Sequence, residues 1–437
     1  ERFKYWSYHF VYWWWYGNSN NRRTCIKGGA AMKYTSKHQI MQITIEDQVA
    51  VLTMQMPGKV NKINHLFVDD FTDALNEIKK QTDLRGVIIT STHQDFCVGA
   101  DLDVVACSKN QADLEPLLHN LNQQLRNLEQ LKVPVIAAIN GSAFGGGYEL
   151  ALACHRRVAV QGKQVRIGLP EVMLGLIPGA GGTQRLPRLI GIQKSLEAIL
   201  QGKTYRTQKA FELGMVDALA KDSSELMSLS KEWIQKYPTI QQPWDQKKSK
   251  GLYPGAQSEE ARNIFLGTCA FLQKKTAGAV LAPKLALSAI QEGLKLTFDG
   301  GIQVENQYFM QAVASNQSSA MIDTFWVHKS KAEKLAGLPE SKDHGIKKIG
   351  IIGAGMMGKG LANLCAKSGF QVVLKDIDED VLENAMQHCV QHSSPEVAKR
   401  ITLTTQSSML HDCELIIEAV FENLKLKHQV MAEIEPK

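Results

Sequence analysis

Two acidic residues near a run of glycines are the first candidates for chemistry in this chain. Residues 145–149 read Gly-Gly-Gly-Tyr-Glu, and a second glutamate, Glu171, follows Leu169-Pro170. Two carboxylates that face one water can position it, take its proton and return a proton to carbon, provided that their environments separate their pKa values. A glutamate at a helix start is also a common partner of the helix dipole. Spacing alone therefore leaves Glu149 open to a structural role.

Backbone amides beside these carboxylates are candidates for binding a negatively charged oxygen. The three glycines allow a tight turn before a helical pattern begins, and a helix N-terminus attracts anions, so Gly146 is one candidate donor. Residues 96–101, Phe-Cys-Val-Gly-Ala-Asp, form a second glycine turn, in which the Ala100 amide is the other. Two such donors would polarise a thioester carbonyl and hold the adjacent enolate. The alternative is that each turn only connects a strand to a helix.

A second glycine segment has the spacing of a dinucleotide-binding turn. Residues 353–358 read Gly-Ala-Gly-Met-Met-Gly, a weak signal by itself. Here it follows a predicted strand, 348–352, and precedes helical spacing at Leu361, Leu364 and Cys365 and a further strand, 371–374. Asp376 ends that strand. A carboxylate there can bond the adenosine ribose and would repel a 2′-phosphate, which favours NAD over NADP.

Alternating strands and helices must position these segments, which indicates an α/β layout. The apolar pattern predicts a strand hairpin that turns at Glu46-Asp47, a helix, two buried strands and two further helices. The predicted elements are the hairpin 43–54, a helix with Phe67, Phe71, Leu75 and Ile78 on one face, the strand 86–89, a helix through Leu114, Leu118, Leu121, Leu125 and Leu128, the strand 133–139 and a helix over 207–214.

The length of 437 residues favours two or three domains. We predict a first α/β domain over 33–220, connecting helices that pack against it over 221–345, and a second α/β domain over 346–437. The connecting segment contains a predicted long helix around Leu281 to Leu296 and ends in a linker from Pro339 to Gly345.

Composition excludes several classes of function. The net charge is +6, but the first 31 residues hold most of that excess, so nothing predicts nucleic acid or an anionic membrane as a partner. The eight cysteines include no Cys-x-x-Cys. They indicate reduced packing thiols rather than disulfides or a metal site.

Residues 1–32 form a leader unlike the rest, with ten aromatics in the first sixteen positions. We interpret it as a non-native or disordered extension, with the natural start near Met32; an interfacial aromatic anchor is the alternative. No export or transit pattern is visible, which favours the cytoplasm, although a mitochondrial matrix enzyme without its presequence would look the same.

Residues 33 to about 220 resemble the crotonase, or enoyl-CoA hydratase, family. The resemblance rests on residues 99–101 (Gly-Ala-Asp), the 145–149 segment, and Pro170-Glu171 through residues 177–186 (Ile-Pro-Gly-Ala-Gly-Gly-Thr-Gln-Arg-Leu). It implies a crotonase-like fold of repeated ββα turns. It also implies Ala100 and Gly146 as oxyanion donors, with Glu149 and Glu171 as the acid and base that add water across a 2-enoyl-CoA. Family isomerases often lack one of the glutamates, so the presence of both favours hydration.

Residues 346–437 resemble the Rossmann-type NAD-binding domain of 3-hydroxyacyl-CoA dehydrogenases. Residues 417–427, Ile-Glu-Ala-Val-Phe-Glu-Asn-Leu-Lys-Leu-Lys, match the family segment after a late strand. The resemblance places the family's catalytic His–Glu pair beyond Lys437, so we expect this domain to be incomplete. The residues implied to contact the cofactor are Gly353, Gly355, Met357, Gly358, Asp376, Val420, Glu422 and Lys427.

The order of the two domains is similar to that of the α-subunits of multifunctional fatty acid β-oxidation complexes. This similarity implies acyl-CoA thioester substrates, NAD-dependent oxidation after hydration in the complete protein, and a thiolase subunit as partner. A Δ3-Δ2-enoyl-CoA isomerase in the same site, or a non-catalytic acyl-CoA or NAD-binding scaffold, are the alternatives.

Overall fold

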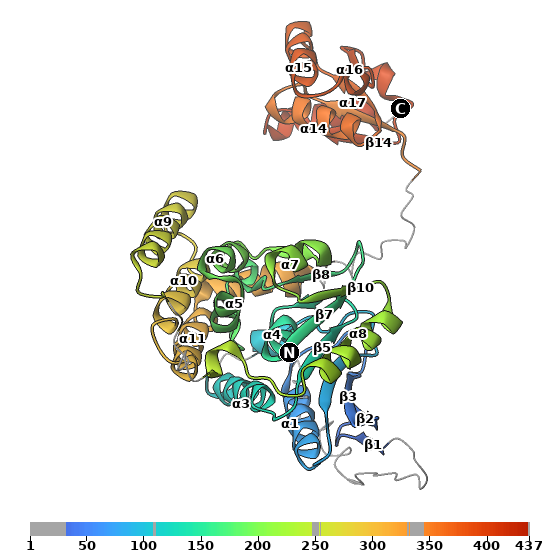
Figure 1. Cartoon of the computed structure of the whole chain (residues 1–437). Helices are drawn as coiled ribbons and strands as arrows, with labels where there is room; N and C mark the ends of the chain where they lie inside the picture. Colours follow the sequence, from blue (N-terminus) through green and yellow to red (C-terminus); the bar gives the residue numbers. More distant parts are fainter. Residues whose placement is uncertain are drawn as a thin grey trace, which may run out of the picture. The chain divides into compact units, whose positions relative to one another are not determined.

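The computed structural model describes residues 32–107, 111–246, 253, 255–329, 332 and 345–435. The chain divides into two compact units, Glu1–Ala336 and Gly337–Lys437, which we describe one at a time (Figure 1). The predicted leader before residue 32 and positions 339–344 of the predicted linker lie outside the described residues. None of the described helices is both long and apolar enough to cross a membrane.

The first unit is built on a seven-stranded sheet and a smaller three-stranded sheet. The large sheet is antiparallel across its first three strands and parallel thereafter. In sheet order its strands are β1 (Met32–Thr35), β2 (Met41–Glu46), β3 (Val49–Met54), β4 (Gly86–Ser91), β5 (Val135–Ile139), β7 (Arg156–Val160) and β10 (Ala218–Ala220). The small sheet contains β6 (Ala143–Phe144), β8 (Arg166–Gly168) and β9 (Thr204–Arg206).

Helices pack around both sheets of this unit (Figure 1). Those within the first 236 residues are α1 (His65–Lys79), α2 (Leu102–Cys107), α3 (Gln111–Glu129), α4 (Gly146–Ala153), η1 (Glu171–Leu174), α5 (Gly182–Ile190), α6 (Ile192–Leu200), α7 (Thr207–Leu213) and α8 (Ser223–Lys236). Those that follow are η2 (Pro243–Asp245), α9 (Glu259–Thr276), α10 (Ala282–Gly293), α11 (Phe298–Val313), α12 (Asn316–Ile322) and η3 (Asp323–His328).

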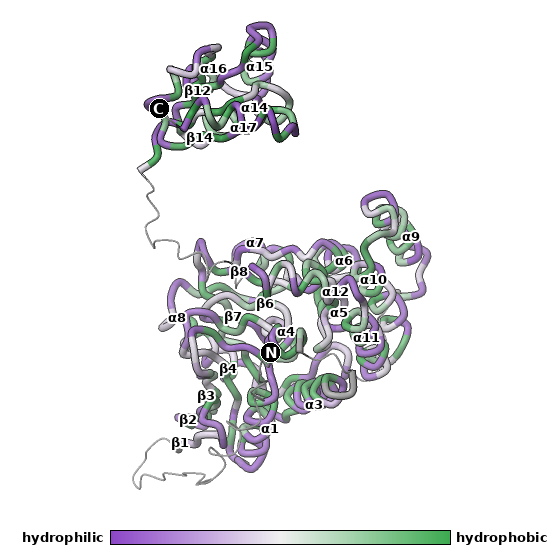
Figure 2. Tube along the Cα trace, turned by 180° about the vertical axis from the view of Figure 1, so that it is seen from behind, coloured by the Kyte–Doolittle hydropathy of each residue, from purple (hydrophilic) through white to green (hydrophobic). Residues whose placement is uncertain are grey.

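The predicted hairpin is confirmed as β2 and β3, which pair from Met41 with Met54 to Glu46 with Val49. Its turn places Asp47 and Gln48 at positive φ. The apolar face predicted for the first helix is also confirmed, since all four of its residues are buried in α1. The amphipathic pattern of α3 is visible in Figure 2 as alternating apolar and polar stretches along the helix. These elements share one continuous core.

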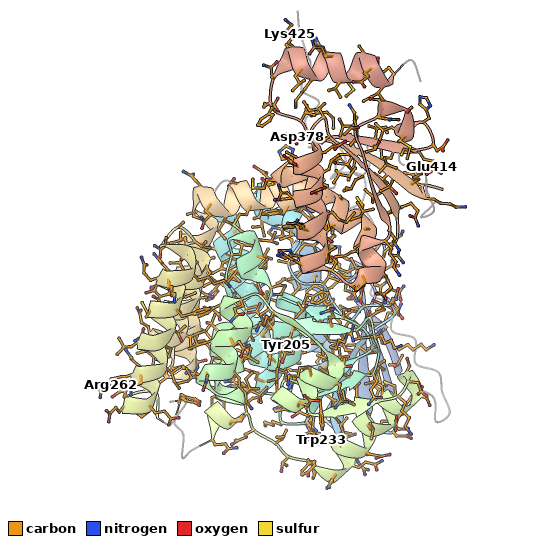
Figure 3. All side chains as sticks on the ribbon, turned by 90° about the horizontal axis from the view of Figure 1, so that it is seen from above. Tyr205, Trp233, Arg262, Asp378, Glu414 and Lys425 are labelled. Carbon is orange, nitrogen blue, oxygen red and sulfur yellow. The ribbon has the colours of Figure 1, made fainter. Side chains whose placement is uncertain are left out.

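The predicted long helix around Leu281 to Leu296 is confirmed as α10, although the chain turns before Leu296. Helix α10 ends at Gly293, and α11 begins at Phe298 after Thr297, whose hydroxyl accepts the Gly300 amide. The two helices pack against each other and against α5 (Figure 1). Helix α9 lies further out, and Arg262 on it points away from the unit (Figure 3). The connecting helices therefore form part of the first unit.

The second unit is a four-stranded parallel sheet with helices, the arrangement of a Rossmann-type domain. Its strands, in sheet order, are β13 (Ile401–Thr404), β12 (Gln371–Lys375), β11 (Lys348–Ile352) and β14 (Leu415–Glu418). Its helices are α14 (Met356–Lys367), α15 (Glu379–His392), α16 (Pro395–Ala398), η4 (Ser407–Leu410) and α17 (Leu424–Ile434). Asp378 and Glu414, labelled in Figure 3, lie just before α15 and β14. The order reverses between β11 and β14, so a ligand crevice is expected at that edge.

The predicted helix in this unit is confirmed as α14. Of the three residues at helical spacing, Leu361 and Cys365 pack against the core, whereas Leu364 is 60% exposed. The helix buries Gly358 and small or polar residues one turn apart. Small side chains allow the helix to approach the sheet closely, so the larger apolar residues are displaced to its flank.

Candidate active site

A cavity of about 150 Å³ in the first unit brings together all four residues predicted to catalyse hydration. Ala100, Gly146, Glu149 and Glu171 all line it. Most of the remaining wall is apolar and comes from α2, α3, α11 and the segment after η1; it includes Val105, Leu118, Leu121, Leu176 and Phe309. The structure therefore places these four residues around one cavity.

Close backbone contact holds the two glycine turns together. The Phe144 amide donates to the carbonyl oxygen of Cys97 at 3.0 Å. Gly99 has a φ of +98°, and a Cβ on it would lie 2.8 Å from the Phe144 carbonyl oxygen. A Cβ on Gly147 would lie 2.2 Å from the Cys97 carbonyl oxygen. Glycine is required at both positions because any side chain would force the turns apart.

The two amides predicted to bind the oxyanion lie side by side. Gly146 is the first residue of α4, after Gly145 at a φ of +51°. A Cβ on Gly146 would be 3.8 Å from the Ala100 nitrogen, so the two amides are neighbours. Within the described part of the chain, neither amide N–H donates a hydrogen bond. Two free amides at a helix start, facing a cavity, can bind one oxygen that gains negative charge.

Glu149 is held by two other backbone amides. Its Oε1 accepts the amides of Ala180 at 2.8 Å and of Gly182 at 2.7 Å. A Cβ on Gly182 would lie only 2.8 Å from that oxygen, so glycine allows the approach. The residue is only 2% exposed. Burial raises the pKa of Glu149 to about 7, although the two amides favour its charged form.

Glu171 has the opposite environment. Both of its carboxyl oxygens are buried, and neither has a hydrogen-bond partner among the described residues. Burial and the nearby charge of Glu149 raise the pKa of Glu171 well above its usual value. Its Oε1 lies against the Gly145 turn, 3.0 Å from where a Cβ would be. Glu171 follows Pro170 directly and begins the short 3-10 helix η1.

The contrast between the two carboxylates separates their chemical roles. Glu149 accepts two amides that stabilise its charge, whereas the carboxyl oxygens of Glu171 accept no hydrogen bond from the described residues. Such a pair retains one proton more readily on the unpartnered group. The site can therefore offer a base and an acid to the same water and the same carbon chain, with an oxyanion pocket beside them.

One buried carboxyl group near this site, that of Glu305, belongs to no motif that the sequence shows. Glu305 on α11 is fully buried and bonds the segment between Gly181 and Thr183. A signal was present, because Glu305 lies on the same helix face as Phe298 and Phe309, which are buried. A charged residue on an apolar helix face requires a partner inside the protein.

In the second unit, the predicted glycine turn lies at the edge where the strand order reverses. Gly353 has a φ of +99°, and a Cβ on it would lie 2.6 Å from the Ala419 carbonyl oxygen. A Cβ on Gly358 would lie 1.7 Å from the Gly353 carbonyl oxygen. Gly355, in contrast, has no atom within 4 Å of its Cβ position. The backbone of the turn is thus closely packed at Gly353 and Gly358, whereas the space beside Gly355 is open. This open space at the start of α14 fits a pyrophosphate group.

The remaining residues predicted to contact the cofactor surround the same edge. Asp376 follows β12, and its Oδ2 accepts the Ala354 amide at 2.6 Å. Val420 and Glu422 follow β14, and Lys427 on α17 pairs with Glu422 at 2.8 Å. Met357 on α14 is mostly exposed. The structure thus places these residues in the loops after the parallel strands and in the helices that follow, where dinucleotides bind in such folds.

We expect Glu171→Gln to stabilise the protein against unfolding at neutral and alkaline pH. A carboxyl whose pKa is raised in the folded state holds its proton there while the unfolded chain is ionised, so stability falls as pH rises through that window. An amide carries no charge to bury. The Tm of the variant should exceed that of wild type by a few degrees near pH 8, where about 1 kcal/mol corresponds to roughly 2–4 °C. The advantage should shrink toward pH 5.

Thermal melts of both proteins at several pH values test this expectation. Glu212→Gln, at a surface glutamate paired with Lys209, is the matched control and should show no such trend. A Tm difference between Glu171→Gln and wild type that does not depend on pH would mean that the pKa of Glu171 is not raised in the folded protein.

Sequence comparisons identify relatives of both units. Residues 44–249 match the family model described as enoyl-CoA hydratase/isomerase. Residues 348–437 match that of the NAD-binding domain of 3-hydroxyacyl-CoA dehydrogenase.

Individual relatives cover nearly the whole chain. The fatty acid oxidation complex subunit alpha of Shewanella loihica is 35% identical over 413 residues, which is 90% of this chain and 57% of that protein. Its counterpart in Shewanella frigidimarina is 33% identical over 406 residues, or 89% and 57% of the two chains. The chain thus spans somewhat more than half the length of these relatives. Among solved structures, an enoyl-CoA hydratase from Bacillus anthracis is 28% identical and covers 68% of this chain and 97% of its own, with a TM-score of 0.43.

Proposed function

We propose that the first unit adds water to 2-trans-enoyl-CoA. Residues 44–249 belong to the enoyl-CoA hydratase/isomerase family, and residues 348–437 belong to the NAD-binding domain family of 3-hydroxyacyl-CoA dehydrogenases. The product is a 3-hydroxyacyl-CoA. The fold is accordingly a crotonase-like domain with its connecting helices, followed by a Rossmann-type NAD-binding domain. The observation that carries the proposal is the meeting of two buried carboxylates and two free amides in one apolar cavity.

The geometry supports a specific division of labour. The thioester carbonyl oxygen binds the amides of Ala100 and Gly146, which stabilise it as it becomes an enolate oxygen. Glu149, as the carboxylate, takes a proton from water while the water oxygen bonds to C3. Glu171, in its protonated form, gives its proton to C2. One water molecule is consumed, and proton exchange between the carboxyls or with solvent restores the starting state.

The proposal is tested by incubating the purified chain with crotonyl-CoA and following the loss of the conjugated enoyl-thioester absorbance. Hydration should be rapid and should require both glutamates. A folded protein that leaves crotonyl-CoA unchanged would contradict the proposal and favour a non-catalytic acyl-CoA or NAD-binding scaffold.

A Δ3-Δ2-enoyl-CoA isomerase activity in the same cavity is the second candidate. Moving a double bond needs an oxyanion pocket and one carboxyl that can shift a proton between two carbons. Glu171 has this character, since it lines the cavity and its oxygens have no hydrogen-bond partner among the described residues. Conversion of a 3-enoyl-CoA to its 2-enoyl isomer by Glu149→Gln would separate this activity from hydration.

The activity and partners of the whole protein extend this proposal. NAD would bind through the glycine turn and Asp376, and in the complete protein it would accept a hydride as the 3-hydroxyacyl-CoA becomes a 3-ketoacyl-CoA. The relatives' name, fatty acid oxidation complex subunit alpha, supports assembly with another subunit, for which we propose a thiolase. Their bacterial origin supports a cytoplasmic location.

We expect Asp376→Ala to weaken NADH binding while leaving NADPH binding unchanged or improved. A carboxylate beside the ribose offers NADH a charged hydrogen bond and repels the NADPH phosphate. The shift should be about 1–3 kcal/mol in the ratio of the two affinities. Calorimetric titration of both cofactors measures it.

Asp376→Asn is the matched variant for this experiment, because its amide oxygen can still accept the Ala354 N–H that Asp376 binds. It should also lower the preference for NADH, with less effect on the turn itself. If neither variant changes the ratio of NADH to NADPH affinity, Asp376 only ends the strand and the ribose lies elsewhere.

A further inference from the structure

We propose that Glu305 is a positioning residue for hydration, which holds the 179–183 segment so that its amides orient Glu149. This inference rests on the hydratase function proposed above. Glu305 does not line the cavity, so it acts through the segment and not on the substrate. It lies outside the part of the chain that matches the hydratase family model, on a helix that the sequence assigned to a connecting region.

Four successive amides in this segment alternate between two carboxylates. Those of Ala180 and Gly182 donate to Glu149 at 2.8 and 2.7 Å. Those of Gly181 and Thr183 donate to Glu305 at 2.5 and 2.8 Å. Consecutive residues of the backbone are thus bonded in turn to Glu149 and to Glu305. If the amides of Gly181 and Thr183 moved away from Glu305, the neighbouring amides that hold Glu149 would be displaced as well.

The carboxyl group of Glu305 accepts several hydrogen bonds from this segment. The Thr183 hydroxyl donates to its Oε2 at 2.6 Å, which gives the carboxylate three donors from one short segment. The residue is fully buried. A buried carboxyl group bonded in this way fixes its donors in one geometry, because each donor would lose its hydrogen-bond acceptor by moving.

Helix α11 also holds the start of the same segment, through Asn306 and Phe309. Asn306 accepts a hydrogen bond from the Asn122 side-chain amide at 3.0 Å, and that amide also donates to the Gly179 carbonyl at 2.9 Å. The Phe309 ring lies 2.5 Å from where a Cβ on Gly179 would be. The helix therefore contacts the segment at both ends. Phe309, which contacts the segment, also lines the cavity.

The charge of Glu305 also acts on the two catalytic carboxyls. Burial and the nearby Glu149 raise the pKa of Glu305 to about 8, and Glu305 in turn helps to raise that of Glu171. The positive groups that face this cluster come from α5. Arg185 is paired with Glu129 at 2.7 Å, and burial lowers the pKa of Arg188 to about 10. At alkaline pH, where Glu305 is ionised, loss of its charge should therefore lower the pKa of Glu171.

The test is Glu305→Gln in the full chain, which keeps the size of the side chain but replaces one of the two carboxyl oxygens that accept these donors with an NH2 group. We expect kcat for crotonyl-CoA hydration to fall by roughly ten- to hundredfold, as misplaced catalytic groups cause, with little change in KM. The alkaline limb of the kcat profile should move to lower pH, since Glu171 must keep its proton. A residue with a purely structural role would lower Tm but leave the profile of the folded protein unchanged.

Asp70→Asn is the matched control. Asp70 is also a fully buried carboxylate that anchors a loop through backbone amides, those of His38 and Ile40, but it lies on α1 and does not line the cavity. This variant should lose stability without a shift in the pH profile. Thr183→Val removes one donor to Glu305 and should lower kcat in the same direction, by less.

The outcomes are separable. Wild-type kcat and pH profile in folded Glu305→Gln would overturn the positioning role, provided that wild type is active and Glu149→Gln is not. If Glu305→Gln does not fold, wild-type kcat in Thr183→Val overturns it. A wild-type chain without hydratase activity would instead contradict the proposed function itself.

Discussion

Replacing Glu149 or Glu171 with glutamine should lower crotonyl-CoA hydration by roughly two orders of magnitude or more. Glutamine keeps the size of each side chain but can neither take the proton from water nor deliver one to C2. Both carboxyl groups are buried in one cavity beside the amides of Ala100 and Gly146. The amides would still bind the thioester, so KM should change much less than kcat.

Steady-state rates of the two purified variants, compared with wild type and with the surface variant Glu212→Gln, provide the measurement. Circular dichroism would establish that each variant is folded. Near wild-type turnover in either Glu149→Gln or Glu171→Gln would rule out a mechanism that needs two carboxyls. Loss of activity in Glu212→Gln would show that the assay reports stability instead.

Gly358→Ala is expected to abolish measurable NADH binding. The added Cβ would lie 1.7 Å from the carbonyl oxygen of Gly353, which is backbone and cannot rotate away. The turn between β11 and α14 would have to open, and the amides that face the pyrophosphate would lose their geometry. Hydration of crotonyl-CoA should be unaffected, because its residues all lie in the first unit.

Gly360→Ala is the matched control for this experiment. Gly360 lies on the same helix, but no atom is within 4 Å of its Cβ position. The substitution should leave NADH binding intact and stabilise the helix by up to about 1 kcal/mol. Calorimetric titration with NADH compares the two variants. Equal affinities would mean that the glycine turn does not form the cofactor site.

The features that sequence could predict are those with a local cause. The turns at Gly99 and Gly145 and the apolar face of α1 depend on neighbouring residues, and each is found where it was expected. The break between α10 and α11 was missed because Leu294 and Leu296 continue the apolar pattern across it. Periodicity shows which residues are apolar, not where the chain turns back.

The environments of the site residues could not be read in the same way. Glu149 bonds amides more than thirty residues away, and Glu305 bonds Thr183 from a position 122 residues along the chain. Such contacts depend on how α5 and α11 pack, which no spacing encodes. The unlike surroundings of Glu149 and Glu171, on which their separate roles depend, are visible only once the chain is folded.

The central claim, that this cavity adds water across an enoyl thioester, is tested most directly by the fate of the water's atoms. The purified chain would convert crotonyl-CoA in water enriched in heavy oxygen and, separately, in deuterium oxide, with the product analysed by mass spectrometry. We predict one heavy oxygen at C3 and one deuterium at C2 of 3-hydroxybutyryl-CoA. A product that gains deuterium without heavy oxygen, or no product at all, would contradict the claim.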